Sequence, residues 1–262
     1  MIAITLVFVI GQRGISAGES EPSLLQVHEL VVQLPGKVVQ INFVQFSQDA
    51  FNLVVIDNAE RGVAKYRNLE EAIVAINCLA GINGGFFERS PFDPVGLMVS
   101  RGIVSGSLQR KSWINGIVAV RRGVPLLSMA DTFVLDGDVS DAIQAGPMLV
   151  QDAKLVGGPY SGRIADRTFI CRSTDGIWGL GVAGPCTLSE LGSLLLGNEV
   201  TALMKIDSAL NLDGGPSTAF WATKENGAIY KAEKWPVRNF VGVIRRKCQP
   251  SLKKKPEKGV KP

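Results

Sequence analysis

At residues 209–218 the sequence reads Ala-Leu-Asn-Leu-Asp-Gly-Gly-Pro-Ser-Thr, an apolar run that enters an Asp-Gly-Gly turn and continues with two hydroxyl residues. The apolar run predicts a strand, and the Gly-Gly pair predicts the turn that ends it. A carboxylate at such a junction is held in place by the strand before it. We therefore expect Asp213 to be presented at a functional site.

A second stretch repeats this pattern, because residues 81–88 read Gly-Ile-Asn-Gly-Gly-Phe-Phe-Glu, in which an apolar segment ends in Asn-Gly-Gly. Paired glycines supply positive φ and let a ligand approach the backbone closely. A simpler interpretation is two hairpin or bulge turns, in which Asn and Asp only tolerate left-handed backbone. Two such turns in one domain favour a shared polar site. Phe86 and Phe87 are interpreted as core residues.

The pattern of apolar residues predicts many strands and few helices. Residues 39–43 and 51–56 predict an antiparallel pair across the turn at 47–49. One helix is expected from residue 69 to about residue 80, with Asn68 as its N-cap, and a second begins at the capping box Thr187-Leu188-Ser189-Glu190. Further short strands are expected at 116–120, 132–135, 148–150, 168–171 and 177–182. We therefore predict a single α+β domain with a largely antiparallel or mixed β-sheet and a few helices packed on it.

The two ends of the chain differ from its middle in composition. Residues 1–10 are apolar apart from Thr5, and small residues follow at 16–18, so residues 1–24 are predicted to be an export signal. Residues 245–262 carry a net charge of +7 while the whole chain carries +4. We expect residues 246–262 to be a disordered basic tail that contacts anionic envelope components, and residues 25–245 to form the catalytic domain. The expected location is therefore periplasmic, at the cell envelope, or secreted.

Few residues are available for thiol or metal chemistry. The four cysteines include no Cys-x-x-Cys pair, and we interpret them as buried thiols, with one disulfide as the alternative. The single histidine, His28, disfavours histidine triads and multi-histidine metal sites. Carboxylates must therefore perform most of the acid–base chemistry.

Several segments occur in the order seen in one enzyme family. They are Asn83-Gly84-Gly85-Phe86-Phe87, the stretch 96–102, Ala145-Gly146-Pro147-Met148-Leu149-Val150, Arg167-Thr168, Leu188-Ser189-Glu190-Leu191 and Asn211-Leu212-Asp213-Gly214-Gly215-Pro216-Ser217. Over residues 25–245 the chain resembles the phosphodiester glycosidases, the family of the mannose-6-phosphate uncovering enzyme and its bacterial relatives. The ordered set is more specific than any single glycine motif. The chain departs from the family at 169–171, where small residues are common.

The resemblance implies hydrolysis of a sugar-1-phosphodiester on an envelope or exported glycan, with cleavage of the glycosidic C–O bond to phosphate. Phosphate is a good leaving group, but its charge must be held by arginine and backbone N–H donors. Asp213 is the predicted nucleophile or general base, Glu88 the second carboxylate, and Arg167 the phosphate clamp, unless Arg167 is in a structural ion pair with Asp166. The predicted substrate-binding residues are Asn83, Gly84, Gly85, Gly146, Asn211, Gly214, Gly215 and Ser217.

Two other functions fit the same residues. One is a non-catalytic envelope protein that binds phosphate-linked glycans on the same fold. The other is a metal-assisted phosphodiesterase, with Asp213, Glu88 and Asp207 as oxygen ligands. The expected reaction requires no cofactor, although a divalent cation is left open, and the expected partner is a phosphate-linked sugar rather than a nucleic acid.

Overall fold

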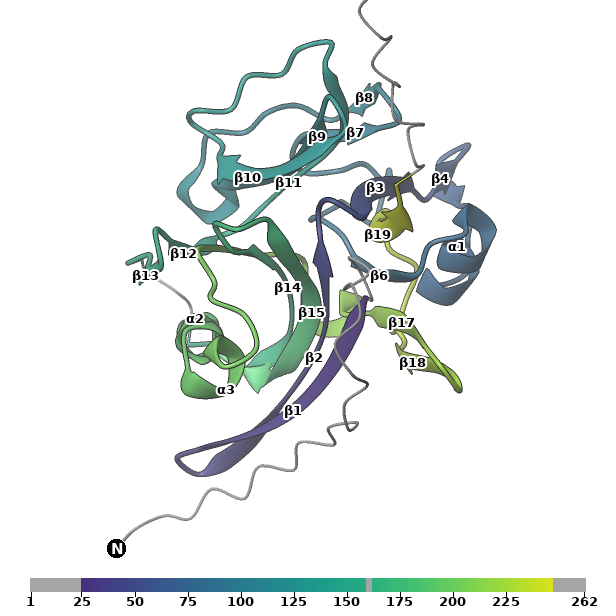
Figure 1. Cartoon of the computed structure of the whole chain (residues 1–262). Helices are drawn as coiled ribbons and strands as arrows, with labels where there is room; N and C mark the ends of the chain where they lie inside the picture. Colours follow the sequence, from purple (N-terminus) through teal and green to yellow (C-terminus); the bar gives the residue numbers. More distant parts are fainter. Residues whose placement is uncertain (1–24, 159–161, 247–262) are drawn as a thin grey trace, which may run out of the picture.

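The structure is a computed structural model that describes residues 25–158 and 162–246 (Figure 1). The predicted export signal at 1–24 and residues 247–262 of the predicted tail lie outside the described residues. Arg246, the first residue of that predicted tail, is part of the folded domain. Its backbone N–H donates to Ala50 O at 2.9 Å, and its guanidinium donates to the carbonyls of Phe51 and Gly123.

The described strands form three antiparallel sheets and one short ribbon. The seven-stranded sheet contains, in spatial order, β1 (Gln26–Leu34), β2 (Lys37–Ser47), β15 (Ile177–Cys186), β14 (Ala165–Arg172), β16 (Ser208–Asn211), β12 (Met148–Gln151) and β13 (Lys154–Leu155). The β6 sheet contains β18 (Gly227–Lys231), β17 (Phe220–Lys224), β6 (Ala80–Asn83), β19 (Asn239–Arg245) and β3 (Phe51–Asp57). The β9 sheet contains β10 (Val124–Met129), β9 (Gly116–Arg121), β11 (Val139–Ala145), β7 (Met98–Ser100) and β8 (Ile103–Ser105). The ribbon pairs β4 (Ala59–Glu60) with β5 (Val63–Ala64).

The helices are short and lie on the outer faces of the sheets (Figure 1). Helix α1 (Leu69–Ile76) packs on the β6 sheet, and α2 (Leu188–Leu195) and α3 (Asn198–Thr201) pack on the seven-stranded sheet. Two 3₁₀ turns span Ser112–Ile114 and Gly215–Ser217. None of the described helices combines the length and apolarity that crossing a membrane requires. The α+β domain with antiparallel sheets and few helices confirms the predicted fold class.

Both helix starts confirm the predicted caps. The Asn68 side chain accepts the Glu71 N–H at 2.9 Å, and Thr187 and Glu190 form the full reciprocal capping box. Helix α1 ends earlier than predicted because Asn77 adopts left-handed backbone, with φ of 58°, and its N–H bonds back into the helix. This early end lets the chain enter β6 at Ala80.

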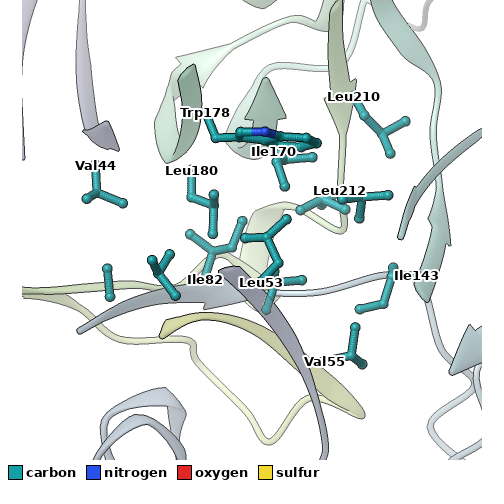
Figure 2. Packing of buried hydrophobic residues seen from close by; sticks show 14 of the residues in the cluster. Val44, Leu53, Val55, Ile82, Ile143, Ile170, Trp178, Leu180, Leu210 and Leu212 are labelled. Carbon is teal, nitrogen blue, oxygen red and sulfur yellow. The ribbon is translucent and has the colours of Figure 1, made fainter. Parts of the chain in front are cut away.

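The main hydrophobic core lies where the three sheets meet. It gathers Trp178, Leu180 and Leu210 from the seven-stranded sheet, Leu53 and Ile82 from the β6 sheet, and Ile143 from the β9 sheet. Figure 2 shows these side chains gathered between strands of the three sheets, with Trp178 and Leu180 both on β15. Because β6, β14 and β16 all border this core, the residues at their ends are held in fixed relative positions.

The predicted pairing of residues 39–43 with 51–56 is wrong, although both segments are strands. Strand β2 pairs with β1 along one edge and with β15 along the other. A strand has two hydrogen-bonding edges, so no edge of β2 remains for β3. The chain turns at 47–50 and β3 joins β19 in the β6 sheet instead.

The strand predicted at 132–135 is also absent. Phe133 is buried beneath the β9 sheet, while Val134 and Leu135 are exposed. The carbonyl of Val134 accepts a bond from the Arg121 guanidinium rather than from a neighbouring strand. A side-chain donor therefore replaces the strand partner that this apolar run was expected to find.

The three cysteines that the structure describes are buried thiols, as predicted. Cys78, Cys171 and Cys186 are free and buried, and burial raises the pKa of the Cys171 thiol to about 12. Cys248 lies outside the described residues. His28 is on β1, where its ring stacks on Phe43 and contacts Gln45.

Candidate active site

The two Gly-Gly turns, remote in the chain, are hydrogen-bonded to each other. Asn83 is the last residue of β6, and Asp213 lies two residues beyond the end of β16. The Asn83 Nδ2 donates to Asp213 O at 2.7 Å, and the Asp213 backbone N–H donates to Gly84 O at 3.1 Å. The two turns therefore lie side by side, and their joint role in one ligand-binding site stays a prediction.

Asn83 is the polar side chain that joins the two sheets at this point. Its Oδ1 accepts from Thr168 Oγ1 at 2.7 Å and from the Ala219 N–H at 2.9 Å, in addition to the Nδ2 bond to Asp213. The side chain is buried, with 1% of the residue exposed. These contacts make Asn83 a residue that positions Asp213, and its predicted role in substrate binding stays a prediction.

The glycines of the first turn are required by packing rather than by backbone conformation. Neither Gly84 nor Gly85 has positive φ. A Cβ on Gly84 would lie 2.0 Å from Asn239 Oδ1, and a Cβ on Gly85 would lie 2.8 Å from Gln144 O. Asn239 also accepts the Gly85 N–H at 2.7 Å through its side chain. The expectation that both glycines supply positive φ is wrong for this turn.

In the second turn only Gly215 has positive φ, at +62°. Gly214 has extended backbone and lies against β14, where an added Cβ would be 2.8 Å from Asp166 O. The residues 213–216 remain partly exposed, whereas Gly84 and Gly85 are buried. This second turn is therefore the one that a ligand can reach.

Asp213 is partly buried and has two hydrogen-bond donors. The Gly214 N–H donates to its Oδ1 at 2.9 Å, and the Ser217 hydroxyl donates to the same carboxylate. Burial raises the pKa of Asp213, and the two donors and the nearby Arg89 oppose this shift without cancelling it. A carboxylate with a raised pKa on a reachable turn is suited to accept a proton during a reaction.

Arginines surround the Asp213 turn. Arg167, on β14 and buried, donates through Nε to Cys186 O at 3.0 Å and through Nη2 to Arg163 O. The Arg163 Nη2 is 3.9 Å from the position of a Cβ on Gly215. Burial lowers the pKa of Arg167, and the neighbouring charge of Arg163 lowers it further. A bound anion would compensate these positive charges.

The alternative ion pair of Arg167 with Asp166 is not formed. Asp166 pairs with Lys231 Nζ at 2.8 Å, and within residues 25–158 and 162–246 no carboxylate lies within ion-pair distance of Arg167. The predicted phosphate clamp therefore has no carboxylate that competes for it in the part of the chain that is described.

The other predicted carboxylates are not joined to Asp213 by any contact. Glu88 is exposed, and its backbone N–H donates to Asp93 O at 2.8 Å at the base of a loop. Asp207 precedes β16 while Asp213 follows it, so the four-residue strand alone separates them by more than about 10 Å. Asp207 therefore cannot share one metal ion with Asp213, which corrects the three-ligand set of the metal-assisted alternative. Glu88 as a catalytic residue stays a prediction.

Within the described ranges, no three His, Cys, Asp or Glu side chains are grouped closely enough to hold a metal ion. The remaining predicted binding residues lie on the same turns or beside them. Asn211 Nδ2 donates to Gly146 O at 2.6 Å, so these two residues fix each other, and Ser217 is buried beside Asp213. Their contact with a substrate stays a prediction.

Three residues near Asp213 were missed by the sequence analysis, namely Arg89, Arg163 and Trp235. The Arg89 guanidinium carbon lies 3.8 Å from the centroid of the Trp235 ring. Trp235 Nε1 donates to Ser217 Oγ at 3.4 Å and so reaches the Asp213 turn. Arg89 directly follows Glu88, and Trp235 is the one aromatic residue in the polar stretch 231–236. The sequence around Arg89 and Trp235 therefore contains no motif that would identify either residue as part of a site.

The fold and the site together define an antiparallel α+β domain that presents one partly buried carboxylate among arginines. The phosphodiester glycosidase family matches residues 76–244 of this sequence, which is more than half of the chain. The chain belongs to the phosphodiester glycosidase family. The match supports a glycosidase-type function.

Solved structures show the same fold at low sequence identity. The catalytic domain of zebrafish N-acetylglucosamine-1-phosphodiester alpha-N-acetylglucosaminidase, described as auto-inhibited by its pro-peptide, matches with a TM-score of 0.64 and 15% identity, covering 87% of this chain and 86% of that one. A hypothetical protein from Synechocystis matches with a TM-score of 0.58 and 15% identity, covering 84% of this chain and 62% of that one. The search of curated proteins finds no match to this sequence.

Proposed function

We propose that this chain hydrolyses sugar-1-phosphodiesters by breaking the bond between the anomeric carbon and the phosphate oxygen. Its products are a free sugar and a phosphomonoester. The observation that carries this proposal is a single partly buried carboxylate, Asp213, on a turn surrounded by Arg89, Arg163 and Arg167. Membership of the phosphodiester glycosidase family supports the same reaction.

The arginines suit a phosphodiester because its leaving group carries charge. As the C–O bond breaks, its electron pair moves to the phosphate oxygen, and the phosphomonoester gains a negative charge. Guanidinium groups stabilise such an anion with directed, charge-assisted hydrogen bonds. Arg167 is buried beside Arg163 without a carboxylate partner among the described residues, so phosphate would supply the missing negative charge.

In this proposal Asp213 acts as the general base. Water attacks the anomeric carbon, its proton passes to Asp213, the new C–O bond forms, and the old bond to the phosphate oxygen breaks. Phosphate needs little protonation to leave, so one well-placed carboxylate is sufficient for the step. The raised pKa of Asp213 brings it closer to neutral pH, which suits a base that must bind and release a proton. This direct attack inverts the configuration at the anomeric carbon.

Isotopically labelled water tests which bond breaks. The full chain is incubated in ¹⁸O water with UDP-N-acetylglucosamine and with the methyl ester of N-acetylglucosamine 1-phosphate, and both products are examined by mass spectrometry. Label in the sugar supports the proposal, whereas label in the phosphate shows P–O cleavage and contradicts it. Proton NMR of the first product formed reports inversion or retention.

The matched variants Asp213→Asn and Asp207→Asn show whether turnover depends on the site. Both residues are partly buried aspartates at the two ends of β16, and only Asp213 lies among the arginines. Hydrolysis that is lost in Asp213→Asn and kept in Asp207→Asn supports the assigned base. Equal loss in both variants, or equal activity in both, contradicts it.

A further inference from the structure

A cavity of about 330 Å³ lies beside Arg89, and its wall is mostly carbon. The residues that matter for its chemistry are Val63, Phe87, Arg89, Phe92, Trp235 and Pro236. Val63 comes from the ribbon β4–β5, the two phenylalanines from the loop after β6, and Trp235 from the segment before β19. Among the described residues that line the wall, Arg89 is the only charged one. The volume falls in the range of small-molecule sites.

The loop between Phe87 and Pro94 is shaped to provide the floor of this cavity. Phe87 and Pro94 form an isolated bridge, which closes the base of the loop together with the bond from the Glu88 N–H to Asp93 O. Phe92 turns back onto Phe87, with ring centroids 5.4 Å apart in an edge-to-face arrangement. To do so Phe92 adopts φ of +74°, which is unfavourable for a residue with a large side chain. The burial of Phe92 in the floor offsets that strain.

The cavity is connected to the Asp213 turn through two of its wall residues. Trp235 donates to Ser217 Oγ at 3.4 Å, and Ser217 in turn donates to the Asp213 carboxylate. Arg89 covers the Trp235 ring, with 3.8 Å from guanidinium carbon to ring centroid, and its charge acts on Asp213. Arg89 therefore stands between the reacting carboxylate and the apolar wall.

We propose that this cavity binds the group esterified to the phosphate and that this group is apolar, either an alkyl chain or an aromatic ring. This inference rests on the proposed function, since it places the phosphate at Arg89 with the sugar on the Asp213 side. Arg89 is assigned to the phosphate and Trp235 Nε1 bonds to Ser217, so the other described side chains of the wall, which are apolar, leave the hydroxyls of a second sugar without partners. An apolar group gains by leaving water at the same position.

The direct test compares three esters of N-acetylglucosamine 1-phosphate that differ only in the alcohol esterified to the phosphate: methyl, benzyl and n-octyl. We expect kcat/KM for the benzyl or octyl ester to exceed that for the methyl ester by about tenfold or more. Benzyl above octyl indicates that the occupant is a ring, and octyl above benzyl indicates a chain. Equal kcat/KM for all three esters overturns the inference and leaves the proposed hydrolysis intact.

Substitutions at two matched valines test whether the preference for the apolar ester arises in the cavity. Val63 is 65% exposed at the cavity wall, and Val31 is 69% exposed on β1 away from it. Because both side chains are largely in solvent, Asp is tolerated at either position. We expect Val63→Asp to lower kcat/KM for the octyl ester by a larger factor than for the methyl ester, so that the preference for the apolar ester is lost. Val31→Asp should change neither, and an equal effect of both variants overturns the inference.

A binding measurement separates failure of this inference from failure of the proposed function. The affinities of n-octyl phosphate and methyl phosphate for the Asp213→Asn chain are measured by calorimetry, with and without Val63→Asp. If no ester is hydrolysed, the proposed function fails, yet tighter binding of octyl phosphate that Val63→Asp abolishes still supports an apolar anion site. Equal affinity for the two phosphates overturns it.

Discussion

The two Gly-Gly turns have almost the same sequence pattern and different surroundings. The Asn83-Gly84-Gly85 turn is buried, its polar groups are bonded within the protein, and its glycines make room for Asn239 and Gln144. The turn at Asp213 is partly exposed and lies among arginines. One turn is therefore a buried support, and the other carries the carboxylate to which the proposed function assigns the chemistry. Similar glycine patterns need not indicate similar roles, because what packs against the turn decides whether a ligand can reach it.

The largest expected effect is on turnover at Asp213. Asp213→Asn should lower kcat by about 10²–10⁴-fold, the usual contribution of a positioned general base, while substrate still binds. The measurement is steady-state kinetics together with binding of the substrate to the variant. If the variant keeps half of the wild-type kcat, Asp213 is not the base, and the two turns no longer differ in their role in the reaction.

The same substitution should not destabilise the protein at neutral pH. Because burial raises the pKa of Asp213, the folded state binds the proton more tightly than the unfolded state does. The bound proton therefore adds to the free energy of unfolding at low pH, and this contribution is lost as the pH rises through the raised pKa. Asp213→Asn removes a charge that opposes folding above this pKa, so denaturant unfolding at pH 7 should show equal or greater stability. Lower stability would contradict the stated cause of the pKa shift.

At Asn83 the expected effect is on stability. Asn83→Ala breaks three hydrogen bonds and leaves buried partners unpaired, which should lower the free energy of unfolding by about 3–5 kcal/mol. Asn211→Ala is the control, since it breaks one bond, to Gly146, and also removes a buried oxygen that has no partner. Its expected loss is about 1 kcal/mol. Equal losses in chemical denaturation would show that Asn83 does not link the turns.

The glycines offer a finer comparison. Gly84→Ala places a methyl group 2.0 Å from Asn239 Oδ1, so it should lower stability by about 3 kcal/mol through displacement of Asn239 and loss of its bond to Gly85. Gly215→Ala meets only Arg163 Nη2, at an ordinary contact distance of 3.9 Å, but keeps positive φ, which costs about 1–2 kcal/mol. Thermal unfolding of both variants checks the order. The reverse order would mean that the first turn has room and the second does not.

The smallest expected effect is a change in the pH dependence of the reaction. The charge of Arg89 lowers the pKa of Asp213, partly opposing the effect of burial. Arg89→Gln should therefore raise this pKa, and the acid limb of kcat/KM should move to higher pH because the base must be ionised. Arg110→Gln, on an exposed residue paired with Asp131, serves as the control. If the pH profile of kcat/KM is the same in Arg89→Gln and in the wild type, the charge of Arg89 does not act on Asp213.

Local signals in the sequence predicted local structure well. Asn68 and the Thr187–Glu190 capping box identified both helix starts, and the two Gly-Gly pairs identified the ends of the strands at the site. The α+β class followed from the number of short strands and the scarcity of helices. Each of these features depends on residues a few positions apart, so periodicity and turn chemistry are sufficient to find them.

The errors concern contacts between distant residues. The pairing of β2 with β3 was predicted from proximity in the chain, but β2 has β1 and β15 as partners. Glu88 as the second carboxylate stays a prediction, but the sequence analysis missed its neighbour Arg89, whose charge acts on Asp213. Adjacent residues in an extended segment point in opposite directions, so a difference of one position changes what reaches the site. Trp235 joins the site only through folding of the segment before β19.

The short ribbon β4–β5 lines the cavity but is not among the described interaction partners of Asp213. It contributes Val63 to the wall of the cavity, while the described interactions of Asp213 are with Asn83, Gly84, Gly214, Ser217 and Arg89. In the proposed reaction, variation in the ribbon would therefore alter which group esterified to the phosphate is accepted, without disturbing the groups assigned to bond cleavage. For an engineer, this ribbon is the place where a library of insertions would be expected to yield new selectivity while the catalytic rate persists.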